Sequence, residues 1–254
     1  MSDSEFASQP LIEHFIELKK RVMIIIASLF VASCICYGFA EQIYAFLVQP
    51  LADAFGDPEA RRLIFTSLTE AFFTYLRLAV FAGFFLAFPI IAAQFYYFLA
   101  PGLYKNERSA FAPYLVAAPV LFLSGAAFVY YLVFPAAWRF FLGFETTALD
   151  GGLPIQLEAK VADYLSLSMH LIIAFGLSFQ LPLVLILLVK AGLMQLETLK
   201  RGRRYAIVII VAVAAIITPP DVFSQIALSV PLYLLYEISI LLCSSKKKEV
   251  THNA

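Results

Sequence analysis

Long apolar segments alternate with short polar segments along most of this 254-residue chain. Most of the apolar segments reach the roughly 20 residues that a helix needs to cross a lipid bilayer. The polar segments hold most of the charges together with prolines and glycines, which favour turns. We therefore predict a single all-α membrane domain over residues 1–254, with a flexible tail at 244–254. Its six spans are expected at residues 22–40, 71–98, 111–135, 161–189, 205–218 and 224–243.

A short amphipathic segment precedes the first span. Residues 10–18, PLIEHFIEL, begin with a proline suited to a first helical position and carry apolar side chains at helical spacing. This pattern predicts a short helix that lies on the membrane surface and ends at the basic residues 19–21. Glu13 and Glu17 are four residues apart on it and share one face, whose simplest interpretation is a solvated acidic surface.

The fifth apolar segment is too short for an ordinary span. Its 14 residues, 205–218, measure about 21 Å as a helix, which is less than the hydrocarbon thickness of about 30 Å. Either the bilayer is thinner at this place or the helix is buried behind others.

Composition agrees with a membrane protein and excludes other classes. The chain is 62% hydrophobic and 14% charged, with a mean hydropathy of +0.85. Its formal net charge is zero, so the charge balance gives no support for nucleic-acid binding. The three cysteines lie in or beside apolar segments and show no spacing typical of a disulfide framework or a metal site.

The positions of the basic residues predict the orientation. One set of flanks contains 13 of them, at positions 19–21, 105, 108, 190, 200, 201, 203, 204 and 246–248. The opposite set contains four, at positions 61, 62, 139 and 160. Basic residues accumulate on the cytoplasmic side, so both termini, the turn near residue 102 and the loop 190–204 are expected there. The two long connections, 41–70 and 136–160, are then expected together on the opposite side.

The segment 98–108, FLAPGLYKNER, is a polar hinge between two apolar segments. Its Pro-Gly pair turns the chain between two spans, which holds Glu107 at a membrane surface between two basic residues. Two interpretations stay open for this carboxylate. It offsets its basic neighbours, or it binds a positively charged segment of a partner, because carboxylate and guanidinium form a bidentate, charge-assisted pair.

Polar residues inside the spans give no enzyme signature. Gln180 should face protein or a wet cavity, because lipid would leave its amide unpaired. His170 has no second ligand at metal-binding spacing and is interpreted as a packing residue, so no metal or cofactor is expected. No nucleophile elbow or phosphate-binding glycine loop occurs. Composition alone favours a permease for a small solute, and an intramembrane protease using Ser124 is a third class.

Four motifs together resemble one family. IEHFIELKKR at 12–21, the FLAPGLYKNER hinge, FGLSFQLP at 175–182 and TPPDVFSQ at 218–225 resemble, in order and spacing, the TatC family of twin-arginine protein translocases. The resemblance extends from about residue 10 to about residue 243. It implies a concave, glove-like arrangement of six helices, of which the last two are short.

The resemblance also implies a function. Family members are receptors for twin-arginine signal peptides of folded proteins and nucleate translocase assembly in the bacterial inner membrane, for export driven by the proton-motive force. Partners would be TatA-type and TatB-type single-helix proteins, with self-association in the receptor complex. By motif match, the signal-peptide site would contain Glu17, Phe98, Lys105 and Glu107. Structural or assembly roles would fall to Pro50, Asp221, Gln225 and Glu237.

Two positions depart from the family pattern. Gln180 stands where many members have an acid, so a partner contact there would need a polar group rather than a charge. Lys19 stands where arginine is frequent, which replaces a planar fork with a point charge.

Overall fold

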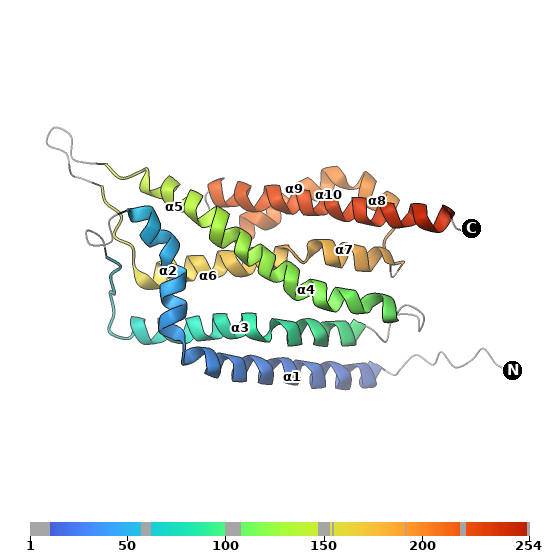
Figure 1. Ribbon diagram of the computed structural model, residues 1–254, viewed down its shortest axis with the longest axis horizontal. Coiled ribbons are helices and arrows are strands. Elements are labelled where there is room, and N and C mark those ends of the chain that lie inside the picture. The colour runs from blue at the N-terminus through green and yellow to red at the C-terminus, as the bar shows by residue number, and fades with distance from the viewer. Residues whose placement is uncertain are drawn as a thin grey trace. The chain divides into compact units, whose positions relative to one another are not determined.

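The computed structural model is almost entirely helical in the part that it describes, and no strand occurs in that part. That part comprises residues 11–56, 62–99, 108–146, 153, 155–190, 192–218 and 222–252. The helices are α1 (Leu11–Tyr37), α2 (Ala40–Phe55), α3 (Glu70–Leu99), α4 (Arg108–Phe128), the π-helix η3 (Val129–Val133), α5 (Phe134–Leu142), α6 (Val161–Ser178), α7 (Leu181–Lys190), α8 (Leu196–Arg201), α9 (Arg203–Ile217) and α10 (Val222–His252) (Figure 1).

Five helical segments are long and apolar enough to cross a membrane, which confirms an all-α polytopic membrane protein. These segments are Phe15–Tyr37, Glu70–Phe98, Tyr114–Leu142, Val161–Lys190 and Val222–Ser244. The remaining expected span, 205–218, coincides with α9 up to Ile217, and the 15 residues of α9 confirm that this helix is short. The expectation of a short final helix is wrong. α10 has 31 residues because its helix continues past the apolar segment through the polar sequence SSKKKE.

The expected surface helix at residues 10–18 is also wrong. α1 is one continuous helix of 27 residues that includes both this segment and the first span. Lysine and arginine are good helix formers, and no glycine or proline interrupts residues 11–37. The basic residues 19–21 therefore lie inside one continuous helix and do not separate two helices.

The expected fourth span is divided into α6 and α7 at Phe179 and Gln180. Pro182 lacks the amide hydrogen that would bond to the carbonyl of Ser178, and its ring disfavours a helix through that turn. Short helices also occupy the connections: α2 follows α1 directly, and α8 lies in the basic loop.

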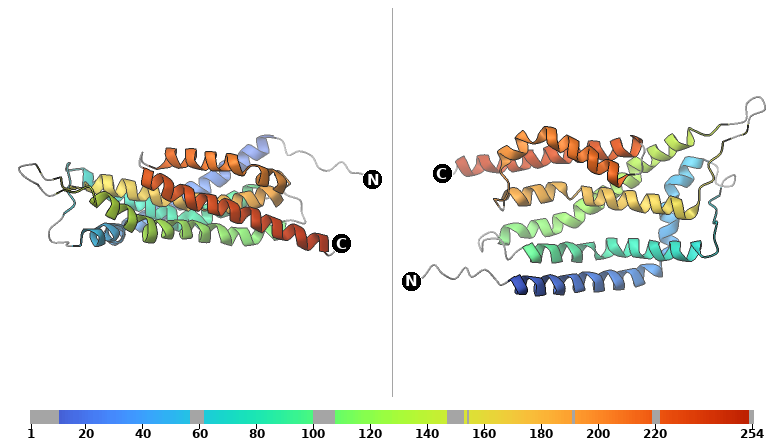
Figure 2. Two further views of the ribbon diagram at one scale, coloured as in Figure 1. Left: turned by 90° about the horizontal axis from the view of Figure 1, so that it is seen from above. Right: turned by 180° about the vertical axis from the view of Figure 1, so that it is seen from behind.

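The chain divides into two compact units, and each is described separately. The first contains residues 1–40 and 76–119, and the second contains 41–75 and 120–254. In the first unit, α1 and α3 lie side by side and antiparallel (Figures 1 and 2). Their core is Ala32, Ala87 and Ile91. Gly83 allows the close approach, because a Cβ there would lie 2.5 Å from Ser33 Oγ and 2.7 Å from its backbone nitrogen.

In the second unit, α10 lies beside α7 and α9 (Figure 2). The two long connections meet at one end, where Ile64 and Lys160 form an isolated bridge. The amide of Ile64 donates to Ala159 at 3.2 Å, and the amide of Val161 donates to Ile64 at 3.1 Å. This confirms that the two connections share one side.

Candidate functional site

A polar cluster lies where the first turns of α1 meet the last turns of α3, inside the first unit. Glu17 and Arg21 are one helical turn apart, so their side chains share a face. Arg21 Nε donates to Glu17 Oε1 at 3.1 Å, and Arg21 Nη2 forms an ion pair with the same oxygen. The carboxylate is therefore fixed by two donors from one guanidinium.

Helix α3 completes the cluster from the opposite side. Arg21 Nη1 lies 3.5 Å from Gln94 Oε1, a long hydrogen bond, and its Cζ lies 5.8 Å from the centre of the Tyr97 ring. The guanidinium thus has a carboxylate, an amide oxygen and an aromatic ring around it. We call Glu17, Gln94 and Tyr97 the guanidinium cradle.

The family resemblance implies four residues of a signal-peptide site, and the structure describes two of them, Glu17 and Phe98. Phe98 is half-buried and follows Tyr97 at the end of α3, so it lies at the same end of the unit as Glu17. Lys105 and Glu107 lie outside the described residues. Arg21, Gln94 and Tyr97 were missed, although the (i, i+4) spacing of Glu17 and Arg21 was visible in the sequence.

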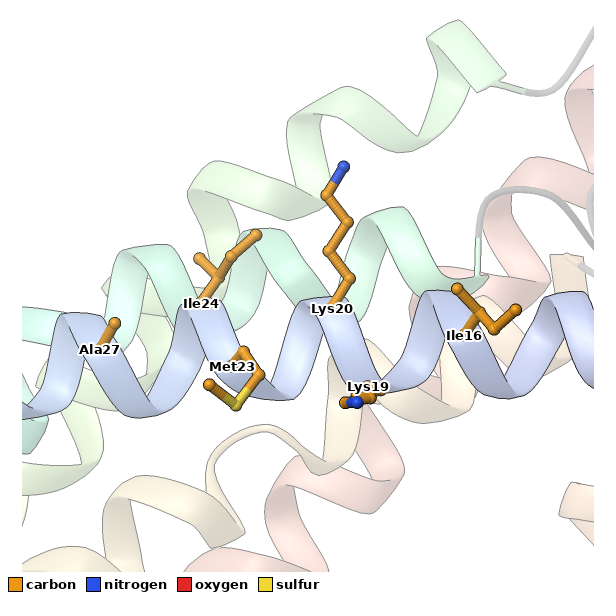
Figure 3. A pocket seen from close by; sticks show the side chains of 6 residues that line it. All are labelled: Ile16, Lys19, Lys20, Met23, Ile24 and Ala27. Carbon is orange, nitrogen blue, oxygen red and sulfur yellow. The ribbon is translucent and has the colours of Figure 1, made fainter.

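An apolar groove begins along α1 beyond the cluster. It has a volume of about 500 Å³ and is lined by the α1 residues Ile24, Ala27, Ser28, Val31, Ala32 and Ile35 and the α3 residues Leu86, Ala87 and Ile90. A second hollow of about 540 Å³ shares Ile24 and Ala27 with it. That hollow is lined by six side chains of α1 between Ile16 and Ala27, with Lys19 and Lys20 among them (Figure 3).

Two of the assembly residues predicted near the C-terminus, Gln225 and Glu237, lie on α10 of the second unit. Glu237 accepts a hydrogen bond from Arg203 Nη2 at 2.9 Å through Oε2 and one from the Tyr233 hydroxyl at 3.1 Å through Oε1. Gln225 Nε2 donates to the Val211 carbonyl at 3.3 Å. Both residues therefore connect α10 with α9. Asp221 lies outside the described residues.

The remaining predicted residues lie at irregular places in helices of the second unit. Gln180 is at the break between α6 and α7, where its carbonyl accepts the amide of Val184 at 3.0 Å. Pro50 is buried within α2. The interpretation of His170 as a packing residue is wrong, because its side chain is exposed on α6. Within the described residues, no group of three or more metal-ligating side chains occurs.

Comparison with known proteins gives one consistent result. Residues 13–231 match the family of Sec-independent protein translocase proteins (TatC). The TatC protein of Rickettsia prowazekii is 48% identical over 91% of this chain and 91% of its own length. The TatC protein of Escherichia coli K12 is 40% identical over 92% of this chain and 87% of its own.

Solved structures agree with the sequence comparison. A crystal structure of the twin-arginine translocase receptor TatC in DDM superposes with a TM-score of 0.78 and 38% identity, covering 90% of this chain and 98% of that one. A second structure of that receptor gives a TM-score of 0.76 and 37% identity over 91% and 98%. The family is a component of a protein translocase and is not an enzyme family. This chain therefore belongs to the TatC family of Sec-independent protein translocase proteins.

Proposed function

We propose that this chain is the receptor subunit that binds twin-arginine signal peptides of folded proteins at the cytoplasmic face of the bacterial inner membrane. The observation that carries the proposal is the guanidinium cradle. At the end of α1 the protein already holds one arginine against Glu17, and the Glu17 side chain remains 26% exposed. The related crystal structures are of a twin-arginine translocase receptor, which supports the same role.

A second acid would complete the recognition of an arginine pair. Glu17 would accept one guanidinium, and Glu107 in the 98–108 hinge would accept the other. Phe98 and Lys105 would belong to the same recognition surface. Each pair is partly wet and contributes only about 1 kcal/mol, so binding also needs apolar contacts.

The groove between α1 and α3 supplies those apolar contacts. Signal peptides carry an apolar segment after the charged one. The groove starts at Ile24, which lies two helical turns beyond Glu17 on α1, and it contains mainly aliphatic side chains. A peptide whose arginines lie at Glu17 can therefore extend its apolar segment along this groove.

The distribution of basic residues supports a cytoplasmic position for the site. The 13 to 4 distribution supports cytoplasmic termini and a cytoplasmic position for Glu17, where precursors arrive after synthesis. No nucleotide-binding motif is present in the sequence, so transport would take its energy from the proton-motive force.

Assembly would use the second unit and the bilayer around it. Gln180 would contact a polar group of a TatA-type or TatB-type helix, because a polar group near the membrane interior gains most from a polar partner. Asp221, Gln225, Glu237 and Pro50 would carry structural or assembly roles, including self-association in the receptor complex.

The proposal is tested by photocrosslinking a labelled twin-arginine precursor to the receptor in membranes. Glu17→Ala and Glu107→Ala should each reduce crosslinking while membrane insertion stays normal. Glu41→Ala is the matched control, because Glu41 is an exposed acid in the first turn of α2. Unchanged crosslinking to both site variants would contradict the proposal. Uptake of small solutes by liposomes that contain this chain alone would instead favour a permease.

A further inference from the structure

Arg21 has a role that the signal-peptide motif does not assign. We propose that Arg21 is a positioning residue that fixes the carboxylate of Glu17 so that one oxygen stays available for a signal arginine. This inference rests on the proposed receptor function and adds a residue that acts through Glu17.

The two carboxylate oxygens of Glu17 have different contacts. Arg21 Nε and Nη2 both bind Oε1 of Glu17. Oε2 has no hydrogen-bond or ion-pair partner among the residues that the structure describes. A carboxylate oxygen can accept hydrogen bonds through two lone pairs, so an incoming guanidinium can bind Oε2 without displacing Arg21.

Arg21 itself is held in place from α3. Gln94 Oε1 accepts from its third donor nitrogen and Arg21 Cζ lies 5.8 Å from the centre of the Tyr97 ring, so the guanidinium has partners on both helices. Its side chain is 19% exposed, compared with 26% for Glu17. Both side chains are thus partly covered, and Arg21 supports Glu17 from the side that contacts α3. A lysine would offer a point charge without the planar fork that reaches Glu17 and Gln94 together.

Simple charge counting predicts the opposite effect, which makes the inference easy to test. A signal peptide with two arginines is cationic, so removal of a positive charge from the receptor should strengthen binding if long-range attraction dominates. If Arg21 acts by orienting Glu17, its removal should weaken binding, because the carboxylate then samples several rotamers and must be ordered on binding.

The experiment measures binding of a fluorescent twin-arginine signal peptide to the full chain in lipid nanodiscs, alongside the same peptide with two lysines. We expect Arg21→Gln to weaken binding of the arginine peptide about tenfold, and Arg21→Lys to weaken it less. In Arg21→Gln the ratio of the dissociation constants of the lysine peptide and the arginine peptide should also be smaller than in the wild type. A loss of folded protein would instead reduce both signals equally.

Lys20→Gln is the matched control, because it removes the neighbouring charge outside the cradle and should bind at least as tightly as wild type. Combined with Glu17→Gln, the change Arg21→Gln should cause little further loss, since its effect passes through that carboxylate. Gln94→Leu changes no charge and should weaken binding of the arginine peptide about threefold. This variant tests the inference even if Arg21→Gln does not fold.

The outcomes separate the inference from the function on which it rests. If Glu17→Gln weakens binding while Arg21→Gln and Gln94→Leu do not, the inference fails and the receptor proposal stands. Tighter binding by Arg21→Gln overturns the inference in favour of long-range electrostatics. If Glu17→Gln also binds like wild type, the proposed role of Glu17 fails, and the role of Arg21 fails with it.

Discussion

The hydroxyl of Tyr130 donates a hydrogen bond to the backbone carbonyl of Phe46, 2.7 Å away and 84 residues earlier in the chain. This carbonyl lies four residues before Pro50 within α2, so proline removes the amide that would normally bind it. The ring of Phe46 stacks on Tyr130 with centroids 4.3 Å apart. η3 therefore supplies the donor that α2 lacks, which gives Pro50 and Tyr130 one shared structural role.

Tyr130→Phe should lower the free energy of unfolding by about 1–2 kcal/mol, because it leaves a part-buried carbonyl without a donor. Thermal unfolding in detergent measures the loss. Tyr131→Phe is the matched control, since Tyr131 is 67% exposed, and should be near neutral. In a Pro50→Ala background the restored amide can bind Phe46, so Tyr130→Phe should cost less there. An equal cost in both backgrounds would contradict this explanation.

Gly83→Ala should separate α1 from α3. The added Cβ would lie 2.5 Å from Ser33 Oγ and 2.8 Å from its Cα, and backbone atoms cannot give way as a flexible side chain can. We expect a loss of about 1–3 kcal/mol in stability and weaker signal-peptide binding, because the guanidinium cradle needs both helices. Gly38→Ala, whose Cβ would meet only Ile35 O at 3.4 Å, is the control. Normal stability of Gly83→Ala would show that the helices are packed less closely.

Glu70 ties the two long connections together and should control their rigidity. One of its oxygens accepts hydrogen bonds from the amides of Thr66 at 2.7 Å and Ser67 at 3.2 Å, and the other accepts the Ala162 amide at the start of α6 at 3.3 Å. Glu70→Ala should increase hydrogen exchange at residues 62–69 and at the first turn of α6. Glu70→Gln keeps an acceptor and should show a smaller increase. Unchanged exchange in Glu70→Ala would mean that the backbone bridge alone holds the connections.

The ion pair between Arg203 and Glu237 should be worth little by itself and should respond to charge exchange. Its side chains are 48% and 26% exposed, so solvent and salt screen the pair. Glu237→Arg should destabilise the protein by roughly 0.5–1 kcal/mol, and addition of Arg203→Glu should restore most of the loss. Melting temperatures at low and high salt measure both effects. If the exchanged pair does not restore stability, Glu237 stabilises the protein through its hydrogen bond with Tyr233 and not through the ion pair.

The lengths of the apolar segments predicted most of the helices, because every span must match the thickness of the bilayer. They could not predict which faces of α1 and α3 meet. α3 is apolar around its whole circumference, so no periodicity shows that Gln94 and Tyr97 point toward Arg21. Gln94 is, however, the one amide side chain in the apolar segment 71–97, and a polar group there needs a partner.

Two helix boundaries had signals in the sequence that the predictions did not use. Ser67 and Glu70 have the spacing of a capping box, a reliable start signal for α3. Pro182 indicated the break between α6 and α7. The contacts of Tyr130 with Phe46 and of Tyr164 with the Leu47 carbonyl, at 2.7 Å, join residues 84 and 117 positions apart. Only the folded arrangement shows them, since hydrogen bonding between distant residues leaves no periodic pattern.

The central claim is that a signal arginine lies at Glu17. It is tested most directly by disulfide trapping in membranes, with the three native cysteines replaced by serine. A precursor with cysteine beside its arginine pair is combined with receptor variants Lys20→Cys and Glu41→Cys. Lys20 lies three residues after Glu17 on α1, so a cysteine there is close to the site and leaves the Glu17 carboxylate in place. We expect an oxidised adduct with Lys20→Cys that is lost when the precursor's arginines are changed to lysines, and no adduct with Glu41→Cys. An adduct with Glu41→Cys alone, or one with Lys20→Cys that does not depend on the arginines, would contradict the claim.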